Sequence, residues 1–236
     1  MWILRGIVQR FVRSIVQGLI CCFLLATVAS AASKVHIITY GKWTSAQWFA
    51  GGTDDKPMTI KIRALVIDGR VKEFVVGSPH DVTDRLFVVR RMFRVNDSLP
   101  EDSAPRWQWQ RGGWLLVDRL TAHISPINLP EFDAFYSAAS WYRDYVAYCG
   151  VADDGKKTYA MVAQLSRRKP VLKKDVSNGA VADDAAPDSA CPVPSWQRNP
   201  VRVSFELAGS AKQTFAVRGH VVDLVNDAEE EEEGSK

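Results

Sequence analysis

The feature that most constrains this chain is a succession of short apolar runs, rich in β-branched residues and separated by turn residues. The clearest case is Asp68-Gly69, which lies between the runs Thr59–Ile67 and Arg70–Val76. Asp-Gly suits the type I′ turn of a two-residue β-hairpin, because both turn positions need a positive φ. Such a turn predicts three cross-strand pairs, which are Val66 with Val71, Ala64 with Glu73 and Ile62 with Val75.

Further turn signals extend this pattern along the chain. Three more hairpins are predicted around the loops Arg111–Gly113, Ala152–Lys156 and Ala208–Lys212. Leu86–Val89 is continuously apolar, which is typical of a strand buried on both faces. The only helical spacing lies in Pro130–Ala139 and covers one or two turns. The sequence therefore predicts an all-β fold of antiparallel hairpins with at most one short helix, arranged as a β-sandwich, a partly open barrel or a small propeller-like array.

The first 31 residues have the pattern of a secretory signal peptide. Arg5, Arg10 and Arg13 form a basic start, an apolar stretch covers Ile15–Val28, and the small residues Ala29–Ala31 follow it. The apolar stretch is shorter than the roughly 20 residues that a spanning helix needs. We expect cleavage, export to the periplasm or the extracellular space, and only transient membrane contact through this segment. An uncleaved N-terminal anchor is the alternative.

Removal of this segment changes the charge balance of the chain. The full sequence holds 30 basic and 27 acidic residues, and its first 31 residues hold three arginines and no acid. The remainder therefore has a formal charge of zero. Because proteins that bind nucleic acid usually show a basic excess, the sequence argues against a nucleic-acid partner.

The rest of the chain is expected to form one domain. Residues 32–225 carry the strand signals, and residues 175–194, rich in Ala, Asp, Ser and Pro, are expected to form a long surface loop within that domain. Residues 226–236 include the run Glu229–Glu233 and are expected to be a disordered acidic tail, because neighbouring like charges repel one another.

Two cysteines remain after cleavage, and we expect them to form a disulfide. Cys149 and Cys191 are an even pair in an oxidising compartment, whereas Cys21 and Cys22 leave with the signal. A bridge between them would lower the entropy of the unfolded chain by about 4 kcal/mol on the loop-closure model. Two buried free thiols are the alternative. Neither cysteine has a Cys or His at zinc-ligand spacing, so no metal and no cofactor is predicted.

Candidate catalytic residues are few. His80, Asp81 and Asp84 form the densest cluster of ionisable residues, and a histidine beside carboxylates can act as a general base in a hydrolase. Ser78-Pro79 precedes them, however, and the two aspartates suit a turn equally well. The chain contains no nucleophile elbow, phosphate-binding loop or dinucleotide-binding motif. No catalytic residue is predicted.

The tryptophans are more distinctive. Alternation along a strand places Trp107, Trp109 and Arg111 on one face, and Arg106, Gln108 and Gln110 on the other. A tryptophan surface bordered by arginine and amide groups could stack on sugar rings or hold an extended peptide. Alternatively, these tryptophans fill the core with arginine stems packed over them. Trp107, Trp109, Arg106 and Arg111 are therefore candidate binding residues, with at least one tryptophan expected in the core.

Two resemblances accompany these patterns. The stretch from Ser140 to Gly155, SWYRDYVAYCGVADDG, is similar to propeller blades of the TolB and WD40 type. From Val35 to about Val225 the chain resembles a group of exported bacterial proteins of unassigned function, through the segments RWQWQRGGWLLVDR and LPEFDAFYSAASWYRDYVAYCGVADDGKK. The second resemblance implies export, and it supplies no activity, cofactor or catalytic residue.

These observations predict an exported, non-catalytic β-rich binding or interaction module. Its partner would be an envelope protein or a glycan. A carbohydrate-binding module that uses the tryptophan and arginine strands is one alternative, and a hydrolase with a dispersed active site is the less favoured one.

Overall fold

The computed structural model of this chain divides into two compact units, Met1–Val35 and His36–Lys236. The structure describes residues 35–48, 58–134, 136–176, 192–206, 212–219 and 221–225. Except for Val35, all of these residues belong to the second unit. The predicted signal peptide, most of the predicted loop at 175–194 and the acidic tail lie outside the described residues.

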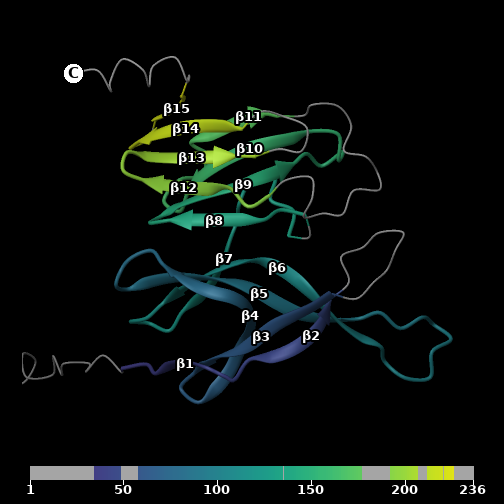
Figure 1. Cartoon of the computed structure of the whole chain (residues 1–236). Coiled ribbons are helices and arrows are strands. Elements are labelled where there is room, and N and C mark those ends of the chain that lie inside the picture. The colour runs from purple at the N-terminus through teal and green to yellow at the C-terminus, as the bar shows by residue number, and fades with distance from the viewer. Residues whose placement is uncertain are drawn as a thin grey trace, which may run out of the picture. The chain divides into compact units, whose positions relative to one another are not determined.

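The described residues form strands and turns, and no helix occurs among them (Figure 1). The all-β prediction is therefore confirmed. The first seven strands are β1 (Ile38–Tyr40), β2 (Thr44–Trp48), β3 (Met58–Ile67), β4 (Arg70–Asp81), β5 (Leu86–Asn96), β6 (Trp107–Asp118) and β7 (Ile124–Ile127). The next four are β8 (Ala139–Tyr142), β9 (Tyr145–Val151), β10 (Thr158–Gln164) and β11 (Leu172–Asp175). The last four are β12 (Ser195–Arg198), β13 (Val201–Phe205), β14 (Gln213–Arg218) and β15 (Val221–Leu224).

The possible short helix at Pro130–Ala139 is not seen in the described residues of that segment, which form turns and the start of β8. Glu131 has a φ of 51°, in the left-handed region. This backbone conformation is incompatible with a right-handed helical first turn, although Pro130 suits one.

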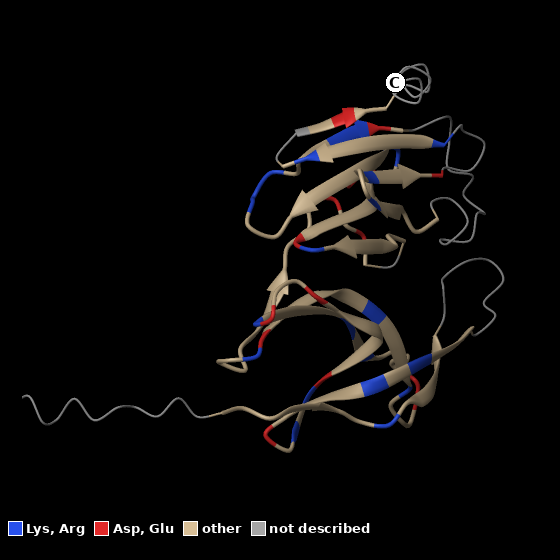
Figure 2. Ribbon diagram, turned by 60° about the vertical axis from the view of Figure 1, so that its left-hand side comes forward, with Lys and Arg blue, Asp and Glu red and all other residues tan. Residues whose placement is uncertain are grey.

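Strands β1 to β7 form one seven-stranded sheet with the order β1-β3-β2-β6-β5-β4, and β7 pairs with β6. Because β3 also pairs with β4, the pairings among β2, β3, β4, β5 and β6 close into a ring. The ring closes where β2 runs parallel to β6, with Trp48 opposite Trp109. Figure 2 shows this sheet curving round on itself, as a partly open barrel would.

The β3–β4 hairpin confirms the predicted turn and corrects its register. Asp68 and Gly69 have φ values of 51° and 75°, as a type I′ turn requires. Val66 pairs with Val71 as predicted, but the next pairs are Ala64 with Phe74 and Ile62 with Val76. A β-bulge between Leu65 and Val66 shifts every pair beyond it by one residue.

The hairpin predicted at Arg111–Gly113 is wrong, because these residues lie inside the continuous strand β6. The register with β5 shifts between Arg90 and Met92, so that the glycines make a bulge rather than a turn. A Cβ on Gly112 would lie 3.2 Å from Cβ of Arg91, which favours glycine at this close approach. The real turn between β5 and β6 is the polar segment at residues 97–106.

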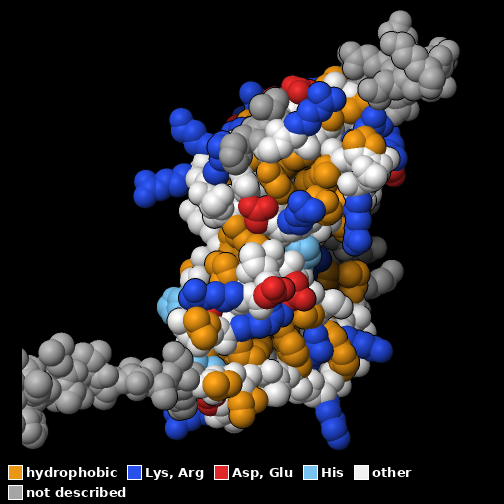
Figure 3. Space-filling model, turned by 90° about the vertical axis from the view of Figure 1, so that its left-hand side faces the viewer, with side chains coloured by type: hydrophobic (Ala, Val, Ile, Leu, Met, Phe, Trp, Pro, Cys, Tyr) orange, Lys and Arg blue, Asp and Glu red, His pale blue; other side chains and the backbone are white. Residues whose placement is uncertain are grey.

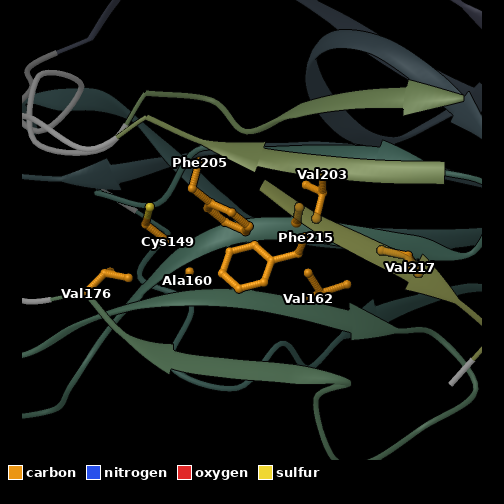
Figure 4. Packing of buried hydrophobic residues seen from close by; sticks show 9 residues of the cluster. Cys149, Ala160, Val162, Val176, Val203, Phe205, Phe215 and Val217 are labelled. Atoms are coloured by element: carbon orange, nitrogen blue, oxygen red, sulfur yellow. The ribbon is translucent and has the colours of Figure 1, made fainter. Parts of the chain in front are cut away.

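The remaining strands form two four-stranded antiparallel sheets, β11-β10-β9-β8 and β12-β13-β14-β15. The hairpins predicted around Ala152–Lys156 and Ala208–Lys212 are confirmed by the pairing of β9 with β10 and of β13 with β14. Side chains from both sheets pack together as a sandwich core (Figure 4), where the rings of Phe205 and Phe215 meet edge to face at 5.9 Å.

The two central strands of the sheet β11-β10-β9-β8, which are β9 and β10, are buried on both faces. Ala147 and Val162 face the sandwich core, whereas Val146, Tyr148 and Met161 belong to a second cluster that also contains residues of β5 and β6. The buried side chain of Arg90 in β5 adds polar links to this cluster, because its guanidinium donates to the carbonyls of residues 134 and 137. The described part of the fold thus places a sandwich against a curved sheet.

Candidate binding surface on the β5–β6 hairpin

The end of the β5–β6 hairpin positions the predicted tryptophans. The register pairs Trp107 with Asn96 and Trp109 with Arg94. Directly paired residues of an antiparallel ladder project to the same face, and so do residues two positions apart. Trp107, Trp109 and Arg94 therefore share one face of the hairpin, and we call these three residues the Trp107 surface.

The two tryptophans of this surface have different environments. Trp107 is 56% exposed, whereas Trp109 is half-buried. The Trp109 ring meets Phe74 of β4 edge to face at 5.1 Å between ring centres, and it packs against the cluster of Ala46, Ile62 and Met92. One tryptophan is thus anchored in the core, and the other is open to solvent.

Arg94 is the cation of this surface. Its guanidinium carbon lies 5.2 Å from the centre of the Trp109 ring, and the side chain is exposed. Within the part of the chain that the structure describes, the side chain of Arg94 makes no hydrogen bond and no ion pair. An arginine stacked in this way keeps all its N–H donors available in the plane of the guanidinium.

The arginines named from the sequence lie elsewhere. Arg106 and Gln108 both donate to one carboxylate oxygen of Asp97, at 3.2 Å and 2.7 Å, so they share the opposite face of the hairpin. Arg111 shares the face of Trp109, but its guanidinium carbon packs 3.8 Å from the ring of the buried Trp48. Arg94 was missed because its partnership with Trp109 depends on the register of two strands.

A second stacked arginine lies on the other face of the seven-stranded sheet. The guanidinium carbon of Arg63 in β3 lies 3.9 Å from the Tyr40 ring centre and 4.4 Å from that of Trp43. Trp43 is 46% exposed, close to the exposure of Trp107. Burial raises the pKa of Tyr40, so its phenol stays neutral near pH 7. This cluster resembles the Trp107 surface in residue types but is separate from it.

The possible hydrolase residues have structural contacts. His80 Nε2 donates to the main-chain carbonyl of Arg143 at 2.8 Å, and its ring stacks on Trp141. Asp81 forms an ion pair with Arg119, and the carbonyl of Asp84 accepts a hydrogen bond from the same arginine. These contacts hold the β4–β5 turn in place, and none of them joins His80 to either carboxylate.

Of the two cysteines predicted to form a disulfide, only Cys149 is among the described residues. Cys149 is buried in the sandwich core, whereas Cys191 lies outside the described residues, so their pairing stays a prediction. Among the residues that the structure describes, no three His, Cys, Asp or Glu side chains are grouped so as to hold a metal ion. The same residues include no helix with the length and apolar character needed to span a membrane.

Charge is mixed rather than concentrated. On the face drawn in Figure 3, basic side chains are interspersed with acidic and hydrophobic ones. That face therefore carries no broad field of one sign that would indicate a charged partner.

Comparison with known proteins adds no further constraint. The predicted resemblances to exported bacterial proteins and to propeller blades stay predictions. No protein-family model, curated protein or solved structure matches this chain.

Proposed function

We propose that this chain is an exported, non-catalytic binding module whose ligand lies on the Trp107 surface. The observation that carries the proposal is the exposure of Trp107 on a regular strand, two positions from a tryptophan that the core holds in place. Tryptophan is enriched at binding interfaces, because its ring combines a large apolar surface with a polar N–H group.

A carbohydrate is the ligand that best fits these side chains. A sugar ring presents C–H groups that pack on an indole face, and hydroxyl groups that accept hydrogen bonds from a guanidinium. The residues paired with the two tryptophans across the ladder are Asn96 and Arg94, both polar and exposed. A protein partner usually needs a wider apolar centre than one exposed ring with polar neighbours.

The test compares two exposed tryptophans. The secreted protein and its Trp107→Ala and Trp43→Ala variants would be titrated with soluble mannan, β-glucan, alginate and peptidoglycan fragments, with calorimetry as the readout. We expect at least one glycan to bind the parent protein and Trp43→Ala equally, and Trp107→Ala at least tenfold more weakly. Mass spectrometry of the glycan should show no cleavage.

Two results would overturn the proposal. One is that no glycan in the panel binds the parent protein, which would leave a protein partner as the better explanation. The other is equal loss of affinity in both tryptophan variants, because the two rings lie on different faces of the sheet.

A further inference from the structure

We infer that the ligand of the Trp107 surface is an acidic glycan, and that Arg94 binds the carboxylate of one of its uronic-acid units. This inference rests on the proposed function and narrows its ligand class. Trp107 would stack on the sugar ring, and Arg94 would select for its charge.

The first argument is the state of the Arg94 guanidinium. Four other arginines, within or next to β5 and β6, are paired with carboxylates of the chain: Arg85 with Asp118, Arg91 with Glu73, Arg106 with Asp97 and Arg119 with Asp81. In the described residues, Arg94 has no such acceptor. Its donors are therefore available to a carboxylate that the ligand brings.

The second argument is that Arg94 is oriented before any ligand arrives. Its guanidinium carbon lies over the Trp109 ring, 5.2 Å from the ring centre, and Phe74 in turn contacts that ring edge to face. Contact with an aromatic ring limits the positions of the guanidinium, whose two parallel N–H groups can donate to the two oxygens of a carboxylate. Loss of side-chain freedom on binding is correspondingly small.

The third argument is the position of Arg94 relative to Trp107. Arg94 pairs with Trp109, so it is the diagonal neighbour of Trp107 on the same face. Diagonal neighbours in an antiparallel pair are about 7–8 Å apart, which long side chains readily span. One uronic-acid unit can therefore lie on Trp107 while its carboxylate reaches the guanidinium.

The experiment uses two oligosaccharides that differ in the carboxylate. A β-1,4-linked mannuronate hexasaccharide would be compared with β-1,4-mannohexaose, its neutral counterpart, by calorimetry with the secreted protein. We expect the acidic sugar to bind at least tenfold more tightly. Arg94→Gln should remove this preference, so that the variant binds the two hexasaccharides with about equal affinity. Arg94→Lys should retain only part of it, because lysine keeps the charge without the planar fork.

Two variants serve as controls for charge. Arg63→Gln removes the other stacked arginine, and Arg106→Gln removes an arginine on the opposite face of the same hairpin. Both should keep the preference for the acidic sugar. Melting temperatures of all variants would establish that each is folded.

The outcomes separate the inference from the function on which it rests. Equal affinity of the parent protein for both sugars, lost in Trp107→Ala, would overturn the role of Arg94 while supporting a glycan-binding module. A preference that survives Arg94→Gln, or that both control variants lose as well, would also overturn it. If neither sugar binds, the inference is overturned, and the wider glycan panel then decides the proposed function.

Discussion

Trp107 and Trp109 lie two positions apart on β6, yet their truncation should have different effects on stability. Trp107→Ala should leave the melting temperature within a few degrees, because more than half of that side chain is already in water. Trp109→Ala should lower the free energy of unfolding by about 2 kcal/mol, because it removes contacts with Phe74 and the adjacent cluster. This loss is smaller than for a fully buried tryptophan, since Trp109 is only half-buried. Urea unfolding of both variants measures the difference, and equal costs would contradict it.

The Arg85–Asp118 ion pair should make stability depend on pH in the acid range. Hydrogen bonding from Arg85 holds the pKa of Asp118 well below its ordinary 3.8. A carboxyl whose pKa is lowered by folding stabilises the protein above its ordinary pKa, and this contribution is lost as the pH falls toward the lowered value. Asp118→Asn should therefore lower the melting temperature at neutral pH.

The difference in melting temperature between the parent protein and Asp118→Asn should become smaller as the pH falls. Because the parent protein loses the contribution of Asp118 below pH 3.8, its melting temperature should approach that of Asp118→Asn there. Melting curves of the two proteins from neutral to strongly acid pH test this. A difference that stays constant over the whole range would show that the ion pair is not its cause.

At the scale of residues, the sequence predicted the alternation on β6 but not the composition of the candidate binding surface. Period two was enough to separate Trp107 and Trp109 from Gln108. Arg94 could not be chosen, because nothing local distinguishes it from Arg91, which pairs with Glu73. Its proposed role depends on which residue of β6 lies opposite, and neither strand by itself specifies that register.

At the scale of elements, turns were more predictable than bulges. Asp68-Gly69 specifies its turn through the positive φ of both residues, a property of the residues themselves. The bulge at Leu65 and Val66 depends on how the hairpin packs beyond the turn, so it shifted the register without a local signal. Gly112-Gly113 resembled a turn because glycine favours both features.

Strand β9 contains a glycine whose replacement should destabilise the fold. A Cβ on Gly150 would lie 2.9 Å from Cγ of Met161 and 3.2 Å from the Glu131 carbonyl oxygen. Gly150→Ala should therefore cost about 1–3 kcal/mol through overpacking. Gly113→Ala is a matched control, since nothing lies within 4 Å of its Cβ, and its effect should be small. Chemical denaturation that ranks the two variants in the reverse order would contradict this account.

At the scale of the whole molecule, the all-β class followed from the sequence, whereas the arrangement of the sheets did not. Val146–Gly150 and Ala160–Ala163 lack the alternation of a strand with one wet face, and both are buried throughout. Such runs indicate burial on two sides, but they do not identify what covers each side. The cover is supplied by β5, β6, β13 and β14, which are distant in sequence.

The predicted disulfide is a property of the whole domain, because Cys149 and Cys191 are separated by two further strands. Non-reducing peptide mapping of the purified protein should recover them in one linked peptide. Reduction should then destabilise the fold by about 4 kcal/mol on the loop-closure model, seen as a lower melting temperature. Recovery of both cysteines as free thiols would end this prediction.

The closure of the ring through Trp48 and Trp109 has a consequence for how the chain folds. Among the described residues, only two pairings join strands that are not consecutive in the sequence, β1 with β3 and β2 with β6. Each of the other pairings can form as soon as a single hairpin has formed. Contact between β2 and β6 has to wait for the three strands between them, and its loop entropy is the largest in that sheet. The slow phase of refolding should therefore be the one that buries Trp48, and Trp48→Phe should remove its fluorescence amplitude in stopped-flow mixing.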